Sequence, residues 1–409
     1  MASLSALREL DSRQRSVVIA SFLGWTLDAF DYFLLVFVIP DVARDFHVDD
    51  RAVFESLTLT LAMRPLGAFI FGRLADRFGR RRVLMVDVIL FAALEAASAL
   101  APSLNVLLVV RALFGIAMGG EWGIGASLAM ESIPARARGI VSGLLQEGYA
   151  AGYLLGALAY GLLFDVIHWR GLLALGILPA VLVLFIRHRV PESPVWEASV
   201  RERPGPRQSL LYGMRGHWPR FFYILLLMTA FNMFSHGSQD VYPTFLKRQM
   251  HFDTKLVSLL AIVLNLGAIV GGLLFGAWSE RVGRKKAIVV AALLAVPIIP
   301  LWSHGATPLA LGVGVFLLQM CVQGAWGVVP AHLNELSPDE LRGTMPGFAY
   351  QGGNLLASNI ALVLAAIANS RGGDYAFAMS SVIATVAVAL AVIAAVGPEA
   401  RGRNFLGGV

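Results

Sequence analysis

A polar stripe interrupts one of the most apolar parts of the chain. After the apolar run from Phe221 to Ala230 come five polar positions: Asn232, Ser235, His236, Gln239 and Asp240. At about 100° per residue, these side chains fall on one face of a helix. Histidine, whose ordinary pKa is about 6.5, can take up a proton on one side of a membrane and release it on the other. The stripe therefore predicts a protein-lined cavity with a titratable wall.

A second polar patch lies in the first apolar segment. Asp28, Asp31 and Tyr32 are spaced i, i+3 and i+4, so they share a helix face. Two carboxylates this close in a low dielectric resist ionising together, which suits a proton carrier. The alternative is that one of them pairs permanently with a cation such as Arg64 or Arg111.

Arg64 and Arg111 are the cations that fall inside apolar segments. Arg64 lies near the middle of its segment, where a cation is costly unless it meets a carboxylate. Its guanidinium can hold a carboxylate in a bidentate fork, so Arg64 is the first candidate for a substrate anchor and Arg111 the second. Arg111 also begins an Arg-x-x-x-Gly pattern. A fixed ion pair with Asp28, Asp31 or Glu121 is the alternative for both.

Two further segments carry polar side chains at similar depth. Gln146, Glu147 and Tyr149 lie in one, and Gln351 and Asn354 share a face of the other. Amide side chains can donate to a carboxylate without adding charge, so we expect Gln351 and Asn354 to complete the site. Hydrogen bonding between helices is the competing interpretation.

The composition is that of an integral membrane protein. Hydrophobic residues make up 57% of the 409 residues, charged residues only 15%, and mean hydropathy is +0.69. Segments long enough for about 20 residues of membrane helix recur twelve times. They lie near 16–40, 53–75, 82–101, 105–130, 140–164, 170–188, 219–246, 256–279, 286–303, 307–330, 343–367 and 375–397, and the split around Pro297 and Pro300 is the least clear.

The distribution of Lys and Arg orients these segments. Most of the 33 cations fall in the two termini and in the loops on the same side. By the positive-inside rule both termini are cytoplasmic, so the net charge of +6 reflects topology and does not imply nucleic acid. The opposite side holds Arg44, Arg51, Arg170, Lys247, Arg248, Lys255 and Arg371.

The chain repeats itself at an offset of 204 residues. The loop GRLADRFGRRR, which begins at Gly72, recurs as GAWSERVGRKK, which begins at Gly276. The same offset relates Glu131 to Glu335 and Arg138 to Arg342. Six helices per repeat give two parallel halves, with a binding site between them near the midplane. We expect an N-terminal six-helix bundle in 1–188, a cytoplasmic linker in 189–218 and a C-terminal bundle in 219–409.

The loop at 72–82 resembles the cytoplasmic signature of the major facilitator superfamily of secondary transporters. That resemblance implies an all-α membrane fold of twelve helices and alternating access by rocking of the two halves. The charged residues in the loops of both copies would form a latch between helices; their alternative role is to anchor the topology. They are Asp76, Arg77, Arg80, Arg138, Glu280, Arg281, Arg284 and Arg342.

Within the superfamily, residues 232–244 resemble the Asn-x-x-[Ser/Thr]-His-x-[Ser/Thr]-Gln-Asp-x-x-x-Thr signature of monocarboxylate (lactate/pyruvate) permeases in the sialate:proton symporter family. Trp25 to Asp31 is similar to that family's first helix, and Gln351 and Asn354 to its eleventh. The resemblance implies proton coupling by His236 and Asp240 and substrate recognition by Asn232. The Arg-x-x-x-Gly pattern at Arg111 resembles that of proton-coupled members, and Glu147 is a further candidate for proton coupling.

The sequence therefore predicts inward symport of a small monocarboxylate with a proton and without a cofactor. Alternatives are symport of a larger acid (sialic acid, an aromatic acid or a dicarboxylate), export of a hydrophobic compound, or a receptor that binds without transport. No catalytic, nucleotide-binding or metal-binding pattern is evident, so an enzyme is not expected. We expect a monomeric multi-pass protein of the inner membrane.

Overall fold

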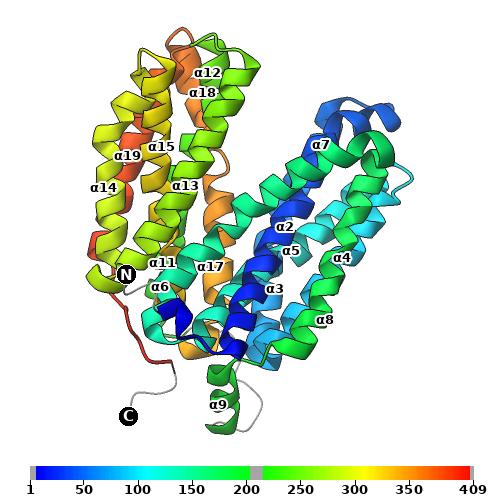
Figure 1. The fold of residues 1–409 in the computed structure, drawn as a ribbon, viewed down its shortest axis with the longest axis vertical. Coiled ribbons are helices and arrows are strands. Elements are labelled where there is room, and N and C mark those ends of the chain that lie inside the picture. The colour runs from blue at the N-terminus through cyan, green and yellow to red at the C-terminus, as the bar shows by residue number, and fades with distance from the viewer. Residues whose placement is uncertain (1–5, 203–214, 406–409) are drawn as a thin grey trace.

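The computed structural model describes residues 6–202 and 215–405, and within them every regular element is a helix. Two bundles stand side by side (Figure 1). The first contains α2 (Ser12–Asp45), α3 (Asp50–Phe78), α4 (Arg80–Ala99), α5 (Leu104–Ser132), α6 (Arg138–Gln146), α7 (Gly148–Ala174) and α8 (Pro179–Arg189). The second contains α11 (Trp218–Gln239), α12 (Tyr242–Arg248), α13 (Thr254–Val282), α14 (Arg284–His304), α15 (Pro308–Trp326), α16 (Val329–Leu336), α17 (Met345–Ala357), α18 (Ile360–Ser370) and α19 (Tyr375–Val396). Between them lies α9 (Pro194–Glu202), and the rest of the predicted linker is partly outside the described residues.

The helices account for twelve membrane crossings. Ten segments of the described chain are long and apolar enough to span a membrane. One of these, Ala135–Arg189, is 55 residues long and reverses at His168, where φ is 53°, so it crosses twice. The remaining crossing, the third along the chain, is α4, whose 20 residues include the acids Asp87 and Glu95. The predicted fold is therefore confirmed.

Several crossings are broken helices, which the sequence segments did not predict. The seventh is interrupted at Asp240 and Val241, between α11 and α12, and the eleventh at Ser358 and Asn359, between α17 and α18. The fifth is interrupted at Glu147. In contrast, α14 continues through both Pro297 and Pro300.

The repeat extends to the backbone conformation. Gly79 and Gly283, 204 positions apart, both have φ of 102°, which L side chains rarely adopt. His47 and His251, which follow α2 and α12, both have φ of 54°. Corresponding loops therefore fold alike in the two halves.

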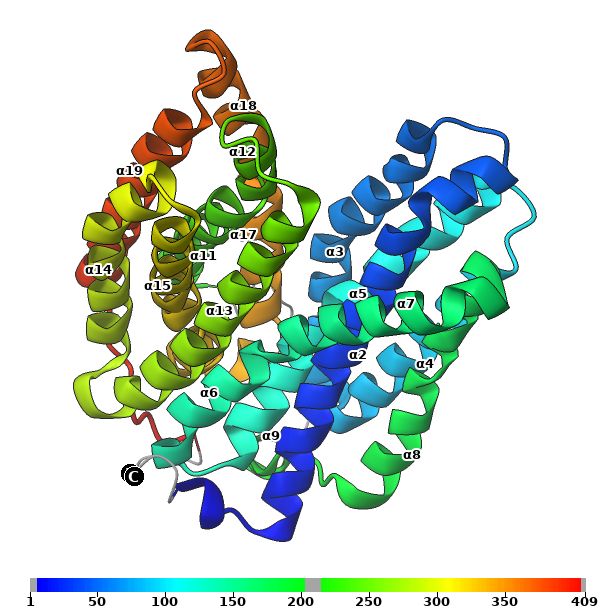
Figure 2. The ribbon, with the colours of Figure 1, turned by 45° about the horizontal axis from the view of Figure 1, so that its top comes forward.

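The bundles touch at one end and diverge at the other. Contacts between them join α6 to α13, α3 and α5 to α17, and α16 to α5 and α6. Small residues permit this approach: a Cβ at Gly139 would lie 2.3 Å from the Gly276 carbonyl oxygen, and one at Gly123 would lie 2.8 Å from the Gly347 Cα. Figures 1 and 2 show the bundles separating away from α9. Because the charge count makes the α9 end cytoplasmic, the molecule faces outward.

Candidate functional site

Arg64 lies in the middle of α3 with its side chain buried. A Cβ at Gly119 of α5 would lie 2.0 Å from the Arg64 carbonyl oxygen, so the two backbones are in close contact and fix the position of Arg64. The side chain is only 4% exposed, and its Nε and Nη2 atoms have no hydrogen-bond partner among the described residues. A buried guanidinium with two unbonded nitrogens is costly, so this arrangement favours an anion beside it. The carboxyl groups of Asp28 and Glu121 lie close enough to interact with its charge, although neither accepts a hydrogen bond within the described residues.

A cluster of aromatic rings lies next to Arg64 and joins the two halves. The Arg64 guanidinium carbon is 6.0 Å from the Trp25 ring centre. Trp25 contacts Tyr149 at 5.6 Å and Tyr350 at 6.5 Å between ring centroids. Tyr350 also contacts Trp122 at 4.6 Å and Trp326 at 5.5 Å, which are equivalent positions of the two repeats. We call these five residues the central aromatic cluster. They link α2, α5 and α7 of the first half to α15 and α17 of the second.

Besides Asp76 and Glu131 at the cytoplasmic end, five acids of the first bundle are fully buried, more than the sequence interpretation had assigned. They are Asp28, Asp31, Asp87, Glu95 and Glu121. Both carboxyl oxygens of four of them lack a hydrogen-bond partner among the described residues; Glu95 is the exception, with one oxygen bonded. The sequence interpretation missed Asp87 and Glu95. Both are acids inside the predicted membrane segment 82–101, and this alone could have marked them as candidates.

Arg111 is already paired in this structure. Its Nη2 lies 2.7 Å from Glu95 Oε1, and both side chains are buried. The predicted alternatives for a fixed partner were Asp28, Asp31 and Glu121, so the identity of the partner is corrected to Glu95. The sequence could not show which carboxylate would face Arg111, because α4 and α5 are separate helices.

The polar stripe of α11 divides into two groups. Asn232 is buried and donates from Nδ2 to the Met228 carbonyl oxygen at 2.8 Å. Gln239 donates to Gln319 Oε1 of α15 at 3.0 Å, so this part of the stripe packs inside the second bundle. The imidazole of His236 and the carboxylate of Asp240 are 3.2 Å apart, and their side chains are 41% and 46% exposed. Proton exchange with water needs this exposure.

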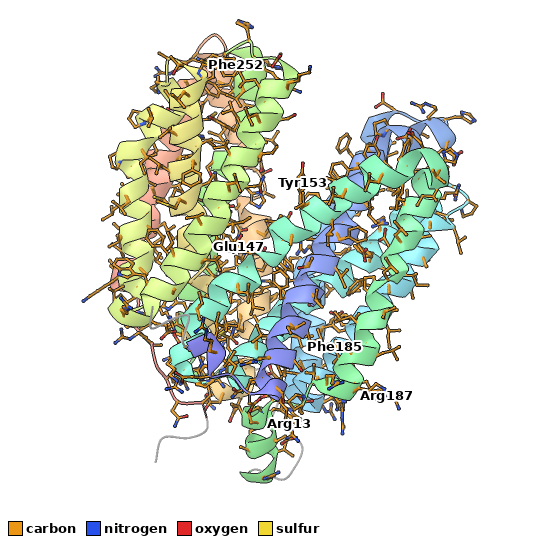
Figure 3. The ribbon with its side chains drawn as sticks, in the orientation of Figure 1. Arg13, Glu147, Tyr153, Phe185, Arg187 and Phe252 are labelled. Carbon is orange, nitrogen blue, oxygen red and sulfur yellow. The ribbon has the colours of Figure 1, made fainter. Side chains whose placement is uncertain are left out.

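The fifth and eleventh crossings bring the remaining candidates to the interface of the halves. Figure 3 shows Glu147 and Tyr153 on the side of α7 that faces the second bundle. Glu147 Oε1 occupies the space that a Cβ on Gly272 of α13 would take, at 2.1 Å. Gln351 is buried, and neither polar atom of its side chain has a hydrogen-bond partner among the described residues, as for Gln146 Oε1. Asn354 is half-buried one turn further along α17.

Most of the predicted latch residues meet at the cytoplasmic end. The Asp76 carboxylate accepts hydrogen bonds from the Gly343 amide at 2.8 Å and from the Thr344 hydroxyl, so it joins the halves. Within the halves, Arg80 binds Glu131 at 3.1 Å and Arg284 binds Glu335 at 2.9 Å.

Two ion pairs cross between the halves in a reciprocal pattern. Arg342 lies 3.5 Å from Glu131, and Arg138 lies 3.8 Å from Glu335. Glu280 also crosses, because its Oε1 accepts from the Gly139 amide. Arg77 and Arg281 are exposed instead, and the structure does not bring their guanidinium groups into this network.

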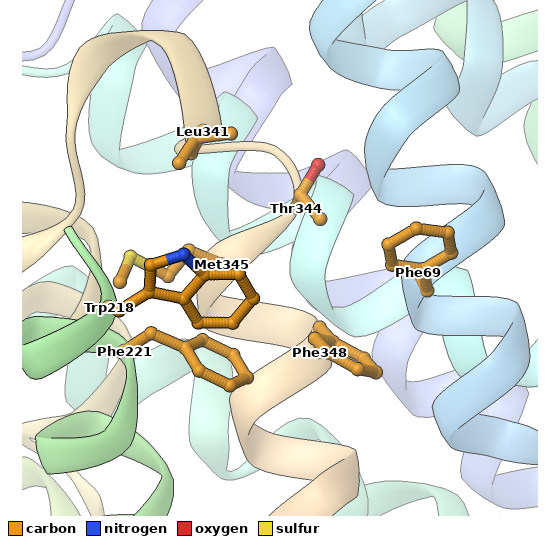
Figure 4. A pocket seen from close by; sticks show the side chains of 7 residues that line it. All are labelled: Phe69, Trp218, Phe221, Leu341, Thr344, Met345 and Phe348. Atoms are coloured by element: carbon orange, nitrogen blue, oxygen red, sulfur yellow. The ribbon is translucent and has the colours of Figure 1, made fainter. Parts of the chain in front are cut away.

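An apolar pocket lies near this latch and is separate from the Arg64 site. Its volume is about 80 Å³, and Figure 4 shows that its walls come from both halves of the chain. They are Phe69, Trp218, Phe221, Leu341, Thr344, Met345 and Phe348. Thr344 is the one polar residue in this lining, and its hydroxyl already donates to Asp76. The pocket therefore offers no charged donor to a carboxylate.

Comparison with known proteins identifies the family. A family model described as Major Facilitator Superfamily matches residues 21–239, and one described as Sugar (and other) transporter matches residues 220–399. The carboxylic acid transporter protein homolog of Saccharomyces cerevisiae (strain ATCC 204508 / S288c) is 29% identical over 380 residues, covering 86% of this chain and 61% of that protein. The sialic acid transporter NanX of Escherichia coli (strain K12) is 26% identical over 402 residues, covering 97% of each chain.

Solved structures share the fold. The proton:xylose symporter XylE bound to 6-bromo-6-deoxy-D-glucose superposes with a TM-score of 0.76 at 19% identity, covering 97% of this chain and 98% of that chain. The Major Facilitator Superfamily model covers more than half of the chain and, together with this fold, establishes the family. This protein belongs to the major facilitator superfamily and is a multi-pass membrane transporter, not an enzyme.

Proposed function

We propose that the protein is a symporter that carries a small monocarboxylate such as lactate or pyruvate inward with a proton. The observation that carries the proposal is Arg64: a buried guanidinium with two unbonded nitrogens, next to the central aromatic cluster that joins the halves. A carboxylate there would receive charge-assisted hydrogen bonds. Gln146, Tyr149, Asn232, Gln351 and Asn354 would complete the substrate site.

Proton coupling is assigned to residues that lie on both sides of the gap. His236 and Asp240 form an exposed pair on the second half. On the first half, the buried acids outnumber the cations, and Asp28 and Asp31 follow Trp25 of the central aromatic cluster on the same helix, α2. Arg111 and Glu147 are the remaining candidates, and the salt bridge from Arg111 to Glu95 would respond to a change of charge at Asp31. The proton is the coupling ion, and no cofactor takes part.

The relatives agree with a carboxylate substrate. The names of the yeast and Escherichia coli proteins describe transport of carboxylic acid and of sialic acid. We further propose that the protein works as a monomer in the inner membrane, with 1–188 and 219–409 rocking about the central site.

A ring-bearing carboxylate is the second candidate substrate, and a row of aromatic contacts between α2 and α7 favours it. Beyond Tyr149 the row continues through Phe33 and Tyr153, whose ring centroids are 4.8 Å apart, and then through Phe37 to Tyr160. Tyr149 and Tyr153 are 36% and 42% exposed. Exposed rings can stack on an aromatic acid, whereas lactate has no ring to stack.

Uptake into proteoliposomes tests coupling and substrate together. Purified protein is reconstituted, and labelled lactate uptake is followed with the outside acidic, with and without a protonophore. We expect lactate accumulation to require the gradient, and we expect excess pyruvate to reduce it by competition. Equal accumulation without the gradient would refute proton coupling. Competition by benzoate that is at least tenfold stronger than by pyruvate would favour the ring-bearing acid, and absence of uptake of either acid would refute both candidates.

A further inference from the structure

The end of the chain crosses the cytoplasmic face after α19. Figure 1 shows this red segment running beneath the second bundle toward the first. It stops, within the described residues, at Phe405, which is only 4% exposed although eight residues separate it from the last helix. Burial of an aromatic ring at the end of an extended tail requires a specific receiving surface.

Two arginines form that surface. The Arg138 guanidinium carbon is 3.5 Å from the centre of the Phe405 ring, and the Arg342 guanidinium carbon is 3.8 Å from it. Arg138 and Arg342 are equivalent residues of the two repeats, and each also makes one of the crossing ion pairs. One ring therefore contacts the matching cation of both halves. Cation–π attraction is strongest where both groups are desolvated, as here.

Side chains of the tail are held mainly by the second half. Arg403 donates to the carbonyl oxygens of Glu335 at 3.3 Å and Ser337 at 3.1 Å, and lies 3.2 Å from Asp339. Glu399 accepts from the Lys285 amide at 3.0 Å. These contacts give the tail a firm attachment to one bundle before it reaches the other.

Contact with the first half is made through Arg138 and through apolar packing, because Phe405 belongs to the buried apolar cluster of that half. The Nη1 of Arg138 donates to the Arg403 carbonyl oxygen at 2.7 Å, and its guanidinium lies over Phe405. When the cytoplasmic ends separate, the tail cannot stay with both halves, so these Arg138 contacts must break. The Arg138 contacts need not change when only the outer ends of the bundles move.

We propose that Phe405 acts as a clasp that holds the cytoplasmic ends together and so favours the outward-facing state. The clasp adds to the crossing ion pairs, but unlike them it is supplied by a segment outside the helical bundles. A ring that only packed against the second bundle would stabilise that bundle equally in both states.

The test measures which state is populated and requires no substrate. Tyr153, exposed at the gap, is replaced by cysteine, and the buried Cys321 by serine, to give a parent with one reactive thiol. The rate of alkylation by a membrane-impermeant maleimide is measured in right-side-out vesicles. Phe405→Ala and Phe405→Leu are compared with Phe405→Tyr, and thermal unfolding of each purified variant checks its fold.

We expect Phe405→Ala and Phe405→Leu to be alkylated at least threefold more slowly, because closing of the outer ends buries position 153. Phe405→Tyr, which keeps the ring face, should label at the parent rate. The leucine variant keeps an apolar side chain of similar bulk, so it separates cation–π contact from packing. Labelling of a folded Phe405→Leu protein at the parent rate would overturn the proposal, as would equal slowing in Phe405→Tyr.

Discussion

At the scale of single residues, the most informative side chain is Arg64. Its cost in an apolar interior is largely the loss of hydration, and a bound carboxylate offsets that cost. Arg111 already forms an ion pair with Glu95 at 2.7 Å, so it has no uncompensated charge for a substrate carboxylate to neutralise. The two cations thus look alike in sequence and differ in structure.

Arg64→Ala should weaken carboxylate binding by about 10- to 150-fold, since hydrogen bonds to charged groups contribute about 1.5–3 kcal/mol. Titration calorimetry of lactate with detergent-purified protein measures it. Arg44→Ala is the matched control, because that arginine is 79% exposed at the outer end. Near-normal affinity in Arg64→Ala would exclude Arg64 as the anchor.

Many site candidates could be proposed from the sequence because polar residues inside apolar segments are conspicuous. The sequence placed Arg64, Asp28 and His236 in membrane segments, and the structure buries Arg64 and Asp28 in the first bundle and leaves His236 41% exposed on the second. It could not pair Arg111 with Glu95 or assemble Tyr350 with Trp122 and Trp326. Those contacts depend on how separate helices rotate about their axes, which periodicity within one helix does not specify. The roles of these residues in transport stay predictions.

At the scale of elements, glycines determine how closely a buried acid can approach a neighbouring helix. Glu121 of α5 lies against Gly24 of α2, where a Cβ would be 2.1 Å from Oε1. Glu95 lies against Gly176 in the same way, at 2.0 Å from its Cγ, and Glu147 against Gly272. Each acid is therefore held at a point where the neighbouring helix has no side chain.

Gly24→Ala should destabilise the protein by about 1–3 kcal/mol, the usual cost of overpacking, despite the better helix propensity of alanine. Thermal unfolding in detergent measures the change. Gly161→Ala is the control, because nothing lies within 4 Å of its added Cβ. The double variant with Glu121→Ala should recover part of the loss, and additive losses would show that Gly24 and Glu121 are independent.

The helix breaks show how far element prediction can reach. Pro243 and Pro330, near the starts of α12 and α16, lack the N–H that would continue the preceding helix. The breaks between α11 and α12 and between α15 and α16 could therefore have been predicted from the sequence. The interruption at Ser358 and Asn359 contains no proline. It depends on packing of α17 and α18 against other helices, which the sequence pattern does not reveal.

At the scale of the whole molecule, the repeat and the topology followed from the sequence, whereas the access state did not. A transporter must adopt more than one state with the same residues, so only relative stability selects one. Here Asp76, fully buried between the halves, contributes to cytoplasmic closure through Gly343 and Thr344.

Asp76→Ala should therefore shift the population toward the inward-facing state. Spin labels on cysteines at positions 77 and 281, exposed equivalents on the two halves, report the cytoplasmic separation by double electron–electron resonance. We expect a longer mean distance in Asp76→Ala and no change in Asp41→Ala, an acid of the outer end. An unaltered distance distribution in Asp76→Ala would show that Asp76 does not contribute to closure.

The crossing ion pairs also bear on the origin of the chain. Arg138 binds Glu335 while Arg342 binds Glu131, so the arginine of each repeat pairs with the glutamate of the other. This reciprocity is the mark of an isologous twofold interface between identical subunits. A half-length ancestor could have made both contacts with a second copy of itself. Phe405 could not have been shared in this way, because two identical tails would compete for the one space between the arginines. Fusion of the copies into a single chain, with a single end, removes that competition.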